Sequence, residues 1–349
     1  MKSKQRITLG MSGGVDSSVS AQLLISVGYD VEGVTCLFVD DKKTCQAAKE
    51  AAASALTLGI SHHVIDCVAC FSRQVISPFI EDYQKGLTPS PCVGCNASCK
   101  IPSLLAAAND LGCSFVSTGH YARIEQTKNG RFVVKTALDT GKDQSYMLSR
   151  LSQEQLSRLI LPLGTWFKDN VRNQAKDLHL AIAEKPDSQD NCFIEGNHVE
   201  YLKAQGVTGV SGDIVTMQGK VVGKHHGLFA YTIGQRKGIG VAAERPYYVL
   251  DKNSTTNELV VGFKEETTIT GVEVSHMVWQ AFESCPPTFE CSVKLRYRSK
   301  PAVCRVTHSG NKLKVTFDEA QPTTAPGQFA VFYHDDTVLG SGIIDKVNR

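Results

Sequence analysis

Short apolar runs alternate with amphipathic stretches over the first part of the chain. The apolar runs have the length of buried strands and occupy residues 7–9, 31–38, 62–66 and 115–118. Stretches with apolar residues at helical spacing separate them and occupy residues 17–27, 43–58, 70–84 and 98–110. Further helical pieces follow at residues 152–160, 168–179 and 197–205. This alternation predicts a doubly wound parallel sheet, in which ligands bind beyond the carboxyl ends of the strands.

The pattern changes at about residue 206. From there, short β-type runs are broken by glycine, and a second β-rich block begins at about residue 267. A length of 349 residues exceeds one typical domain. We therefore expect three units: an α/β catalytic domain at 1–205, a small β-rich central domain at 206–266, and a C-terminal β-barrel at 267–349.

Composition places the chain among ordinary globular proteins. Apolar residues make up 42% of the chain and the net charge is +2, so a polyanion would need a local basic patch. A membrane span needs about 18 consecutive apolar residues, and every apolar run in the chain is much shorter. Residues 1–5 lead straight into a strand without a signal peptide. We therefore expect a cytoplasmic protein with no membrane partner. In that setting the 12 cysteines are not expected to form a disulfide scaffold.

The stretch LGMSGGVDSS, residues 9–18, joins the first apolar run to the first amphipathic stretch. Such a junction directs backbone N–H groups and a helix N-terminus at one point, which suits an anion. Gly13 and Gly14 let the main chain approach closely, and the lysine of a nucleotide-hydrolysing P-loop is absent. The pattern SGGVDS instead resembles the pyrophosphate loop of PP-loop ATP pyrophosphatases, with Asp16 as partner of a magnesium ion. The alternative is a plain glycine turn with Ser17 as helix N-cap.

The cysteines suggest a second chemical site. TPSPCVGCNASCK holds Cys92, Cys95 and Cys99 where a loop runs into a helix, and Cys192 lies in the polar stretch EKPDSQDNCFIEG. A thiol near a helix N-terminus has a lowered pKa, so one of these is a plausible thiolate. Three interpretations stay open: structural thiols, an iron–sulfur cluster on Cys92, Cys95 and Cys192, or a reactive pair for sulfur transfer.

The last block carries a basic segment. Residues 291–317 contain seven Lys or Arg and no Asp or Glu. In VKLRYRSK, a strand would place Lys294, Arg296, Arg298 and Lys300 on one face. Four cations without a counter-charge fit a track for phosphates, and the alternative is an ordinary solvated strand face.

Eight motifs together resemble one family. They are GMSGGVDSS, TPSPCVGCN, STGHYAR, GKDQSYML, DSQDNCFI, YTIGQRKGIG, VKLRYRS and APGQFAVFY. In this order they resemble the tRNA-specific 2-thiouridylases, which replace the 2-oxygen of the wobble uridine in certain tRNAs with sulfur. The resemblance implies adenylation of that oxygen by ATP with Mg²⁺, release of pyrophosphate, and delivery of sulfur from a persulfide. It also implies two partners, tRNA and a persulfide donor that is either a cysteine desulfurase or a sulfur-relay protein.

The resemblance also implies roles for individual residues. Cys95 would be the nucleophile and Cys192 the persulfide carrier, and the two would close a disulfide as sulfur passes to the base. ATP binding falls on Gly10, Met11, Ser12, Gly13, Gly14, Val15, Asp16, Ser17, Leu37 and Gly119. Contact with the target base, flipped from its stack, falls on Ser90, Pro91 and Cys92. Contact with tRNA falls on His120, Lys142, Asp143, Gln144, Arg296, Tyr297 and Gln328.

One departure from the family affects the chemistry. The family often has Asn-Pro-Asp where this chain has Ser90-Pro91-Cys92, so an acidic group is replaced by a thiol. This keeps open an iron–sulfur-dependent thiolation through Cys92, Cys95 and Cys192. Two other classes also remain: a PP-loop enzyme that adenylates a small metabolite, which needs no basic β-domain, and a non-enzymatic RNA-binding protein, which needs no pyrophosphate loop.

Overall fold

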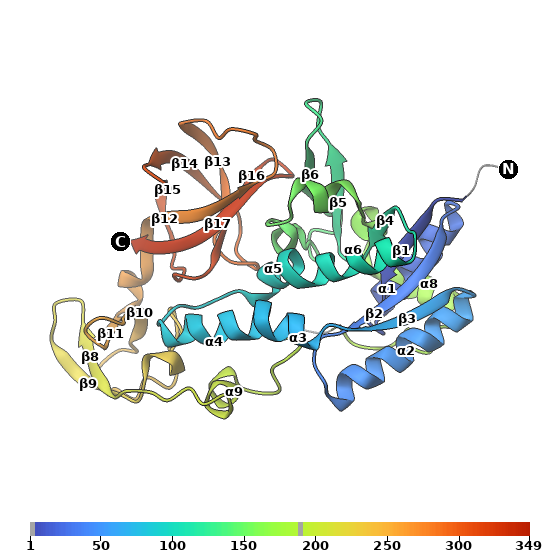
Figure 1. The fold of residues 1–349 in the computed structure, drawn as a ribbon. Helices are drawn as coiled ribbons and strands as arrows, with labels where there is room; N and C mark the ends of the chain where they lie inside the picture. Colours follow the sequence, from blue (N-terminus) through green and yellow to red (C-terminus); the bar gives the residue numbers. More distant parts are fainter. Residues whose placement is uncertain (1–3, 188–190) are drawn as a thin grey trace.

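A parallel sheet organises the N-terminal part of the computed structural model, which describes residues 4–187 and 191–349. The strand order is β3-β2-β1-β4-β7, and every pairing is parallel. The strands are β1 (Arg6–Gly10), β2 (Asp30–Leu37), β3 (Ser61–Asp66), β4 (Phe115–Ser117) and β7 (Leu159–Ile160). The sequence prediction of a parallel α/β domain is therefore confirmed (Figure 1).

Helices cover both faces of this sheet because its strands alternate their side chains. Ile7 and Leu9 of β1 pack in one apolar cluster with α1 (Val15–Ser26) and α2 (Lys42–Leu58). On the other face, Gly10 lies against Leu104 of α6 (Ile101–Asp110), where an added Cβ would be 2.9 Å from a Leu104 methyl group. Two later helices of this part are α8 (Lys168–Asp177) and α9 (His198–Ala204).

Three predicted helices differ in the structure. The stretch 152–160 contains only the short α7 (Gln153–Ser157), and its apolar end forms strand β7 because Leu159 is buried beside β4. The stretch 70–84 consists of α3 (Val68–Phe71), the π turn η1 (Ser72–Ile76) and α4 (Ser77–Gln84). The stretch 98–110 begins earlier, with α5 (Pro91–Cys95) and the π turn η2 (Asn96–Lys100) leading into α6.

A small sheet follows in the middle of the chain. Its order is β10-β11-β8-β9, formed by β8 (Gly212–Thr216), β9 (Val221–His225), β10 (Tyr248–Asn253) and β11 (Glu258–Gly262). Ile214, Val249 and Leu259 are fully buried in its core. Short 3-10 turns accompany the strands here and elsewhere: η3 (Ser145–Leu148), η4 (Pro162–Thr165), η5 (Leu228–Ala230) and η6 (Lys264–Thr267).

The C-terminal strands close into a barrel. They are β12 (Thr268–Trp279), β13 (Thr288–Lys294), β14 (Ala302–Ser309), β15 (Lys312–Pro322), β16 (Phe329–His334) and β17 (Thr337–Asn348). Because β12 pairs with both β15 and β17, the ring has no open edge between its first and last strand. The predicted β-barrel is confirmed.

The predicted strand face of four cations is wrong. Strand β13 ends at Lys294, and a turn follows in which the Ser299 hydroxyl accepts the backbone N–H of Arg296 at 3.2 Å. Arg296, Arg298 and Lys300 therefore project from a loop. The alternation of cationic and other residues continues past Lys294, but the backbone there no longer pairs with a neighbouring strand.

A hairpin of the first unit extends the barrel sheet. β5 (Ala122–Gln126) and β6 (Phe132–Thr136) continue the strand order past β17, with Thr337 opposite Lys135. Phe329 and Tyr333 of the barrel lie in the same apolar cluster as Leu104 of α6. The α/β unit and the barrel thus share one core, as their adjacency in Figure 1 suggests. Within the described residues, the helices are too short or too polar to cross a membrane.

Candidate active site

The loop between β1 and α1 forms one wall of the site. Gly13 has φ +67°, and a Cβ there would collide with the Ala47 carbonyl, so only glycine fits. Gly14 is the N-cap of α1 and Ser17 lies inside the first turn, so the interpretation of Ser17 as a simple N-cap is wrong. Its hydroxyl accepts the Ser12 backbone N–H at 3.2 Å and donates to the Gly14 carbonyl at 3.1 Å. These bonds fix the loop with the helix N-terminus directed at the cavity.

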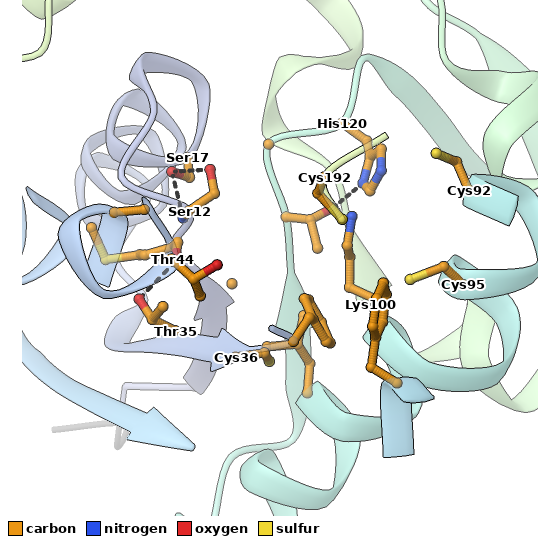
Figure 2. Close-up of a pocket in the computed structure, with 18 of the residues that line it drawn as sticks. Ser12, Ser17, Thr35, Cys36, Thr44, Cys92, Cys95, Lys100, His120 and Cys192 are labelled. Atoms are coloured by element: carbon orange, nitrogen blue, oxygen red, sulfur yellow. Dashed lines mark hydrogen bonds between the residues drawn. The ribbon is translucent and has the colours of Figure 1, made fainter. Parts of the chain in front are cut away.

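A cavity of about 500 Å³ lies at the carboxyl ends of β1 and β2 (Figure 2). Apolar side chains form its walls: Val34, Phe38, Phe71, Val75 and Leu104. Six of the predicted ATP residues line it: Gly10, Met11, Ser12, Asp16, Ser17 and Gly119. The loop of Gly119 packs against α1, since a Cβ at Gly119 would be 2.9 Å from the Ser17 nitrogen. This is a volume suited to a nucleotide-sized ligand.

The other predicted ATP residues lie further from this cavity. Gly14 and Val15 line an adjoining groove, and Gly13 shapes the turn without lining either space. Leu37 lines neither, although its neighbours Cys36 and Phe38 line the cavity. Alternation along a strand explains this, because neighbouring side chains point to opposite faces.

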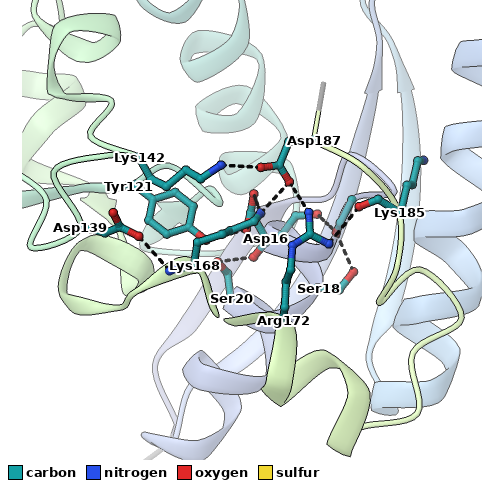
Figure 3. Close-up of polar contacts among 12 residues, drawn as sticks. Asp16, Ser18, Ser20, Tyr121, Asp139, Lys142, Lys168, Arg172, Lys185 and Asp187 are labelled. Atoms are coloured by element: carbon teal, nitrogen blue, oxygen red, sulfur yellow. Dashed lines mark hydrogen bonds and ion pairs between the residues drawn. The ribbon is translucent and has the colours of Figure 1, made fainter. Parts of the chain in front are cut away.

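A partly buried ion-pair network holds Asp16 (Figure 3). The Lys168 ammonium contacts both carboxylate oxygens of Asp16, at 2.6 and 2.8 Å, and one oxygen of Asp187 at 2.9 Å. The Tyr121 hydroxyl donates to Asp16 at 2.7 Å. Burial opposes ionisation of Asp187, but the hydrogen bonds from Lys142 and Lys168 outweigh it and hold its pKa at about 2. The network therefore ties the loop of Asp16 to the segment that leads to Cys192.

The arrangement bears on the metal expectations. Asp16 is a suitable oxygen ligand for Mg²⁺, but both its oxygens already contact Lys168. Across 4–187 and 191–349, no group of three or more His, Cys, Asp or Glu is arranged to hold a metal ion. Cys92, Cys95 and Cys192 are among those residues and do not form a site for a single metal ion, and the iron–sulfur interpretation stays a prediction.

Four cysteines line the same cavity: Cys36 and the three of the predicted sulfur chemistry. Cys92, Cys95 and Cys192 all line it, although Cys95 and Cys192 are 97 positions apart. Cys95 is buried at the end of α5, while Cys92 and Cys192 are exposed. The Cys92 thiol donates to the Asn191 side chain at 3.5 Å, which ties α5 to the Cys192 segment. Residues 188–190 of the DSQDNCFI motif lie outside the described residues.

The thiols differ in acidity. A hydrogen bond with the Cys99 thiol, one turn further along the helix, lowers the pKa of Cys95 to about 7 despite burial. Desolvation of the sulfur raises the pKa of Cys192 to about 11, even though the residue as a whole is exposed. At neutral pH, a larger fraction of Cys95 than of Cys192 is therefore thiolate.

The cavity opens into a larger groove of about 1370 Å³. All ten residues that the sequence associates with the target base or tRNA line it: Ser90, Pro91, Cys92, His120, Lys142, Asp143, Gln144, Arg296, Tyr297 and Gln328. Lys294, Arg298 and Lys300 line it as well. The groove thus runs between the α/β unit and the barrel, with cations on the barrel side.

Several of these groups also hold the groove walls together. Asp143 is buried and accepts the backbone N–H of Ala137 at 3.1 Å. Gln328 donates to the Thr88 carbonyl at 2.7 Å, and Arg296 donates to the Ile233 carbonyl at 3.2 Å. Their side chains connect the barrel to the other two units.

Sequence reasoning missed four residues of the site. Lys100 lines both cavity and groove, and Lys168, Tyr121 and Asp187 form the Asp16 network. Asp187 and Tyr121 stand inside quoted motifs, DSQDNCFI and STGHYAR, so a signal was present for them. Lys168 lies in no motif, and only the fold brings it to Asp16.

Comparison with known proteins places the chain in a family. The model described as tRNA methyl transferase HUP domain matches residues 5–196, the tRNA methyl transferase PRC-barrel domain matches 200–263, and the aminomethyltransferase beta-barrel domain matches 269–344. The tRNA-specific 2-thiouridylase MnmA of Carboxydothermus hydrogenoformans is 40% identical over 358 residues, covering 98% of each chain. A tRNA-specific 2-thiouridylase MnmA 2 of Clostridium botulinum is 41% identical over 352 residues, covering 99% of each chain. With these matches along almost its whole length, the chain belongs to the tRNA-specific 2-thiouridylase MnmA family.

Proposed function

We propose that this protein replaces the 2-oxygen of the wobble uridine in tRNA with sulfur, at the expense of ATP. One observation carries the proposal beyond family membership. The nucleotide-sized cavity opens directly into a cation-lined groove. Cys92 and Cys192 line both spaces, and Cys95 lines the cavity. The junction of the two spaces is therefore accessible to an activating nucleotide, a sulfur carrier and a polyanionic substrate.

Activation uses the loop of residues 10–17 together with Gly119. The N-terminus of α1 and the Ser12 and Ser17 groups receive the phosphates of ATP, and apolar walls receive the base. The 2-oxygen of uridine attacks the α-phosphorus, so pyrophosphate leaves and AMP becomes attached to the oxygen. Mg²⁺, bound through phosphate oxygens, water and Asp16, would shield the negative charge of the phosphates. Asp16 can take that role only by exchanging contacts with Lys168.

Sulfur transfer uses Cys192 and Cys95. A donor protein, either a cysteine desulfurase or a sulfur-relay protein, loads Cys192 as a persulfide. The Cys95 thiolate attacks the Cys192 sulfur, a Cys95–Cys192 disulfide forms, and hydrosulfide leaves with the electron pair of the broken S–S bond. Hydrosulfide adds to C2 of the activated uridine, and AMP departs with the former 2-oxygen. The lowered pKa of Cys95 supports its assignment as attacking group.

Recognition of tRNA uses the groove. Ser90, Pro91 and Cys92 face the uridine, while Arg296 and Tyr297 approach the RNA from the barrel side. We assign catalysis to residues 1–205 and an RNA grip to residues 267–349, with residues 206–266 between them. A PP-loop enzyme for a small metabolite would have no use for a groove of this size and charge.

Thiolation of unmodified tRNA tests the proposal. Protein, tRNA, ATP, Mg²⁺, cysteine and a cysteine desulfurase are combined, and 2-thiouridine is measured by mass spectrometry of digested tRNA. Cys95→Ser and Cys192→Ser should each lose 2-thiouridine formation, and the double variant should be no worse, since the two act as one unit. Cys285→Ser, on a barrel loop, should retain activity.

The same assay separates the alternatives. Full activity of Cys192→Ser would refute the persulfide relay. Activity that depends on added iron under anaerobic conditions would favour cluster chemistry instead. A protein that binds tRNA but releases no pyrophosphate from ATP would be an RNA-binding protein and not an enzyme.

A further inference from the structure

Lys100 occupies an unusual place relative to Cys95. The π turn η2 (Asn96–Lys100) follows α5 directly, and in a π turn residue i+5 bonds to residue i, one position later than in an α-helix. Lys100 is the fifth residue after Cys95, so the wider turn brings it back over the thiol. Its backbone N–H donates to the Cys95 sulfur. A regular helix would place Cys99, and not Lys100, in this position.

Lys100 lines the same cavity as Cys92, Cys95 and Cys192. It lines both the nucleotide cavity and the RNA-facing groove. Figure 2 shows its ammonium group directed toward Cys192 and His120, with Cys95 and Cys92 on the adjacent helix. The Lys100 charge acts on both Cys192, the proposed persulfide carrier, and Cys95, the proposed attacking thiol.

Electrostatics agree with this geometry. The positive charge of Lys100 opposes the effect of burial on the pKa values of Cys92 and Cys192, and it helps lower the pKa of Cys95. The neighbouring His120 adds no charge, because burial lowers its pKa to about 3. Cys36, on the β2 side, stays protonated because its bond with Cys67 and burial raise its pKa.

The cation has no carboxylate partner in the part of the chain described by the structure. Asp16, which lines the cavity, and Asp187, which lines the groove, both pair with Lys168. A half-buried ammonium group in such a cavity is stabilised by an anion brought or formed there. The thiols that face it are the groups that become anionic during sulfur transfer.

We propose that Lys100 is a catalytic residue of sulfur transfer, whose ammonium group stabilises the Cys95 thiolate and the hydrosulfide released from Cys192. This inference rests on the proposed function and deepens it. As Cys95 attacks the Cys192 persulfide, negative charge moves from the Cys95 sulfur to the departing hydrosulfide. Lys100 adjoins both ends of that movement, so it lowers the energy of the charge throughout and takes no proton itself.

Alkylation of Cys95 tests the inference without tRNA or ATP. The rate of iodoacetamide reaction at Cys95 is followed against pH by peptide mass spectrometry in the full-length protein and in Lys100→Met. Loss of the cation should shift the profile upward by about one unit or more. Starting from a pKa of about 7, one unit reduces the thiolate present at pH 7 about fivefold.

Two variants serve as controls. Lys100→Arg keeps the charge and should keep the profile, and Lys49→Met, on an exposed face of α2, should leave it unchanged. Thermal unfolding checks that Lys100→Met is folded. In the full reaction, Lys100→Met should form 2-thiouridine at least fivefold more slowly, and this loss should exceed its effect on pyrophosphate release.

The outcomes are distinct. An unchanged Cys95 profile in folded Lys100→Met overturns the inference, even if the unmodified protein thiolates tRNA. Equal losses of pyrophosphate release and 2-thiouridine would also overturn it, because they place Lys100 in activation. Absence of 2-thiouridine with the unmodified protein, together with a shifted profile, would refute the proposed function and leave the charge effect standing.

Discussion

Replacing Lys168 by methionine removes the charge that joins Asp16 to Asp187 while keeping most of the side-chain volume. The Lys168 side chain is only 7% exposed, and the Asp16 and Asp187 side chains are 32% and 26% exposed. In the variant, Asp16 keeps only the Tyr121 hydroxyl among the contacts described above. Asp187 keeps Lys142 and Arg172, at 2.8 and 2.9 Å.

The expected cost lies between two limits. Removing one partner of a fully buried ion pair costs about 3–5 kcal/mol, and an exposed pair contributes about 0–1 kcal/mol. Because both carboxylates are partly exposed and each keeps another hydrogen bond, we expect a loss of about 2 kcal/mol. Urea unfolding followed by tryptophan fluorescence measures it, and Trp166 reports locally because it packs against α1 and α8.

A double variant makes the argument specific. Lys168→Met with Asp16→Asn has no uncompensated charge on Asp16, so part of the loss should be recovered. The coupling between the two changes should be about 1 kcal/mol or more. Lys176→Met is the matched control, because its pair with Glu184 is exposed at both ends, and its effect should stay within about 0.5 kcal/mol. Additive effects of the Lys168 and Asp16 changes would refute the reasoning.

Three further predictions follow from the same contacts. Cys99→Ala removes the hydrogen bond that lowers the pKa of Cys95, so that pKa should rise above about 7 and alkylation of Cys95 at pH 7 should slow. Cys99→Ser keeps a hydrogen-bond donor and serves as the control. Equal alkylation rates in the unmodified protein and both variants would contradict the prediction. Arg298→Gln with Lys300→Gln should weaken tRNA binding and flatten its salt dependence by about one unit of slope per lost phosphate contact, as measured by filter binding. The folded-state pKa of Asp187, about 2, is below the 3.8 of an unperturbed aspartate, so its contribution to stability is full above about pH 4 and is lost as the pH falls toward 2. Acid unfolding of Asp187→Asn should lack this part.

Local patterns predicted the sheet and the loop well. The apolar runs and the glycines of residues 9–18 act through neighbours in sequence, and the structure has β1, the turn and α1 in that order. The π turn after Cys95 has no comparable signal in the sequence, because one extra residue per turn changes the hydrogen-bond partner without changing the apolar spacing. Lys100 was therefore not recognised.

Contacts between residues far apart in the sequence were the main features that the sequence did not predict. Lys168 and Asp16 are 152 positions apart, and a charge pair of this kind depends on how α8 docks against α1. The end of β13 was missed for a different reason. The cations continue to alternate after Lys294, while the turn depends on hydrogen bonds between Ser299 and Arg296 that the alternation does not reveal.

The β5–β6 hairpin joins the barrel and the catalytic unit into one continuous structure. Arg123 of β5 pairs with Asp336 at 2.6 Å, and Arg131 at the turn donates to the Trp279 and Gln280 carbonyls. A chain shortened to residues 1–205 would leave the β6 edge unpaired and free to associate with another copy. The intact chain keeps a constant span between the barrel and the nucleotide cavity. If the barrel holds RNA as proposed, the distance between the barrel and the cavity selects RNA stem–loops by the length of their stem. A stem of another length would not bring the target base to Cys95.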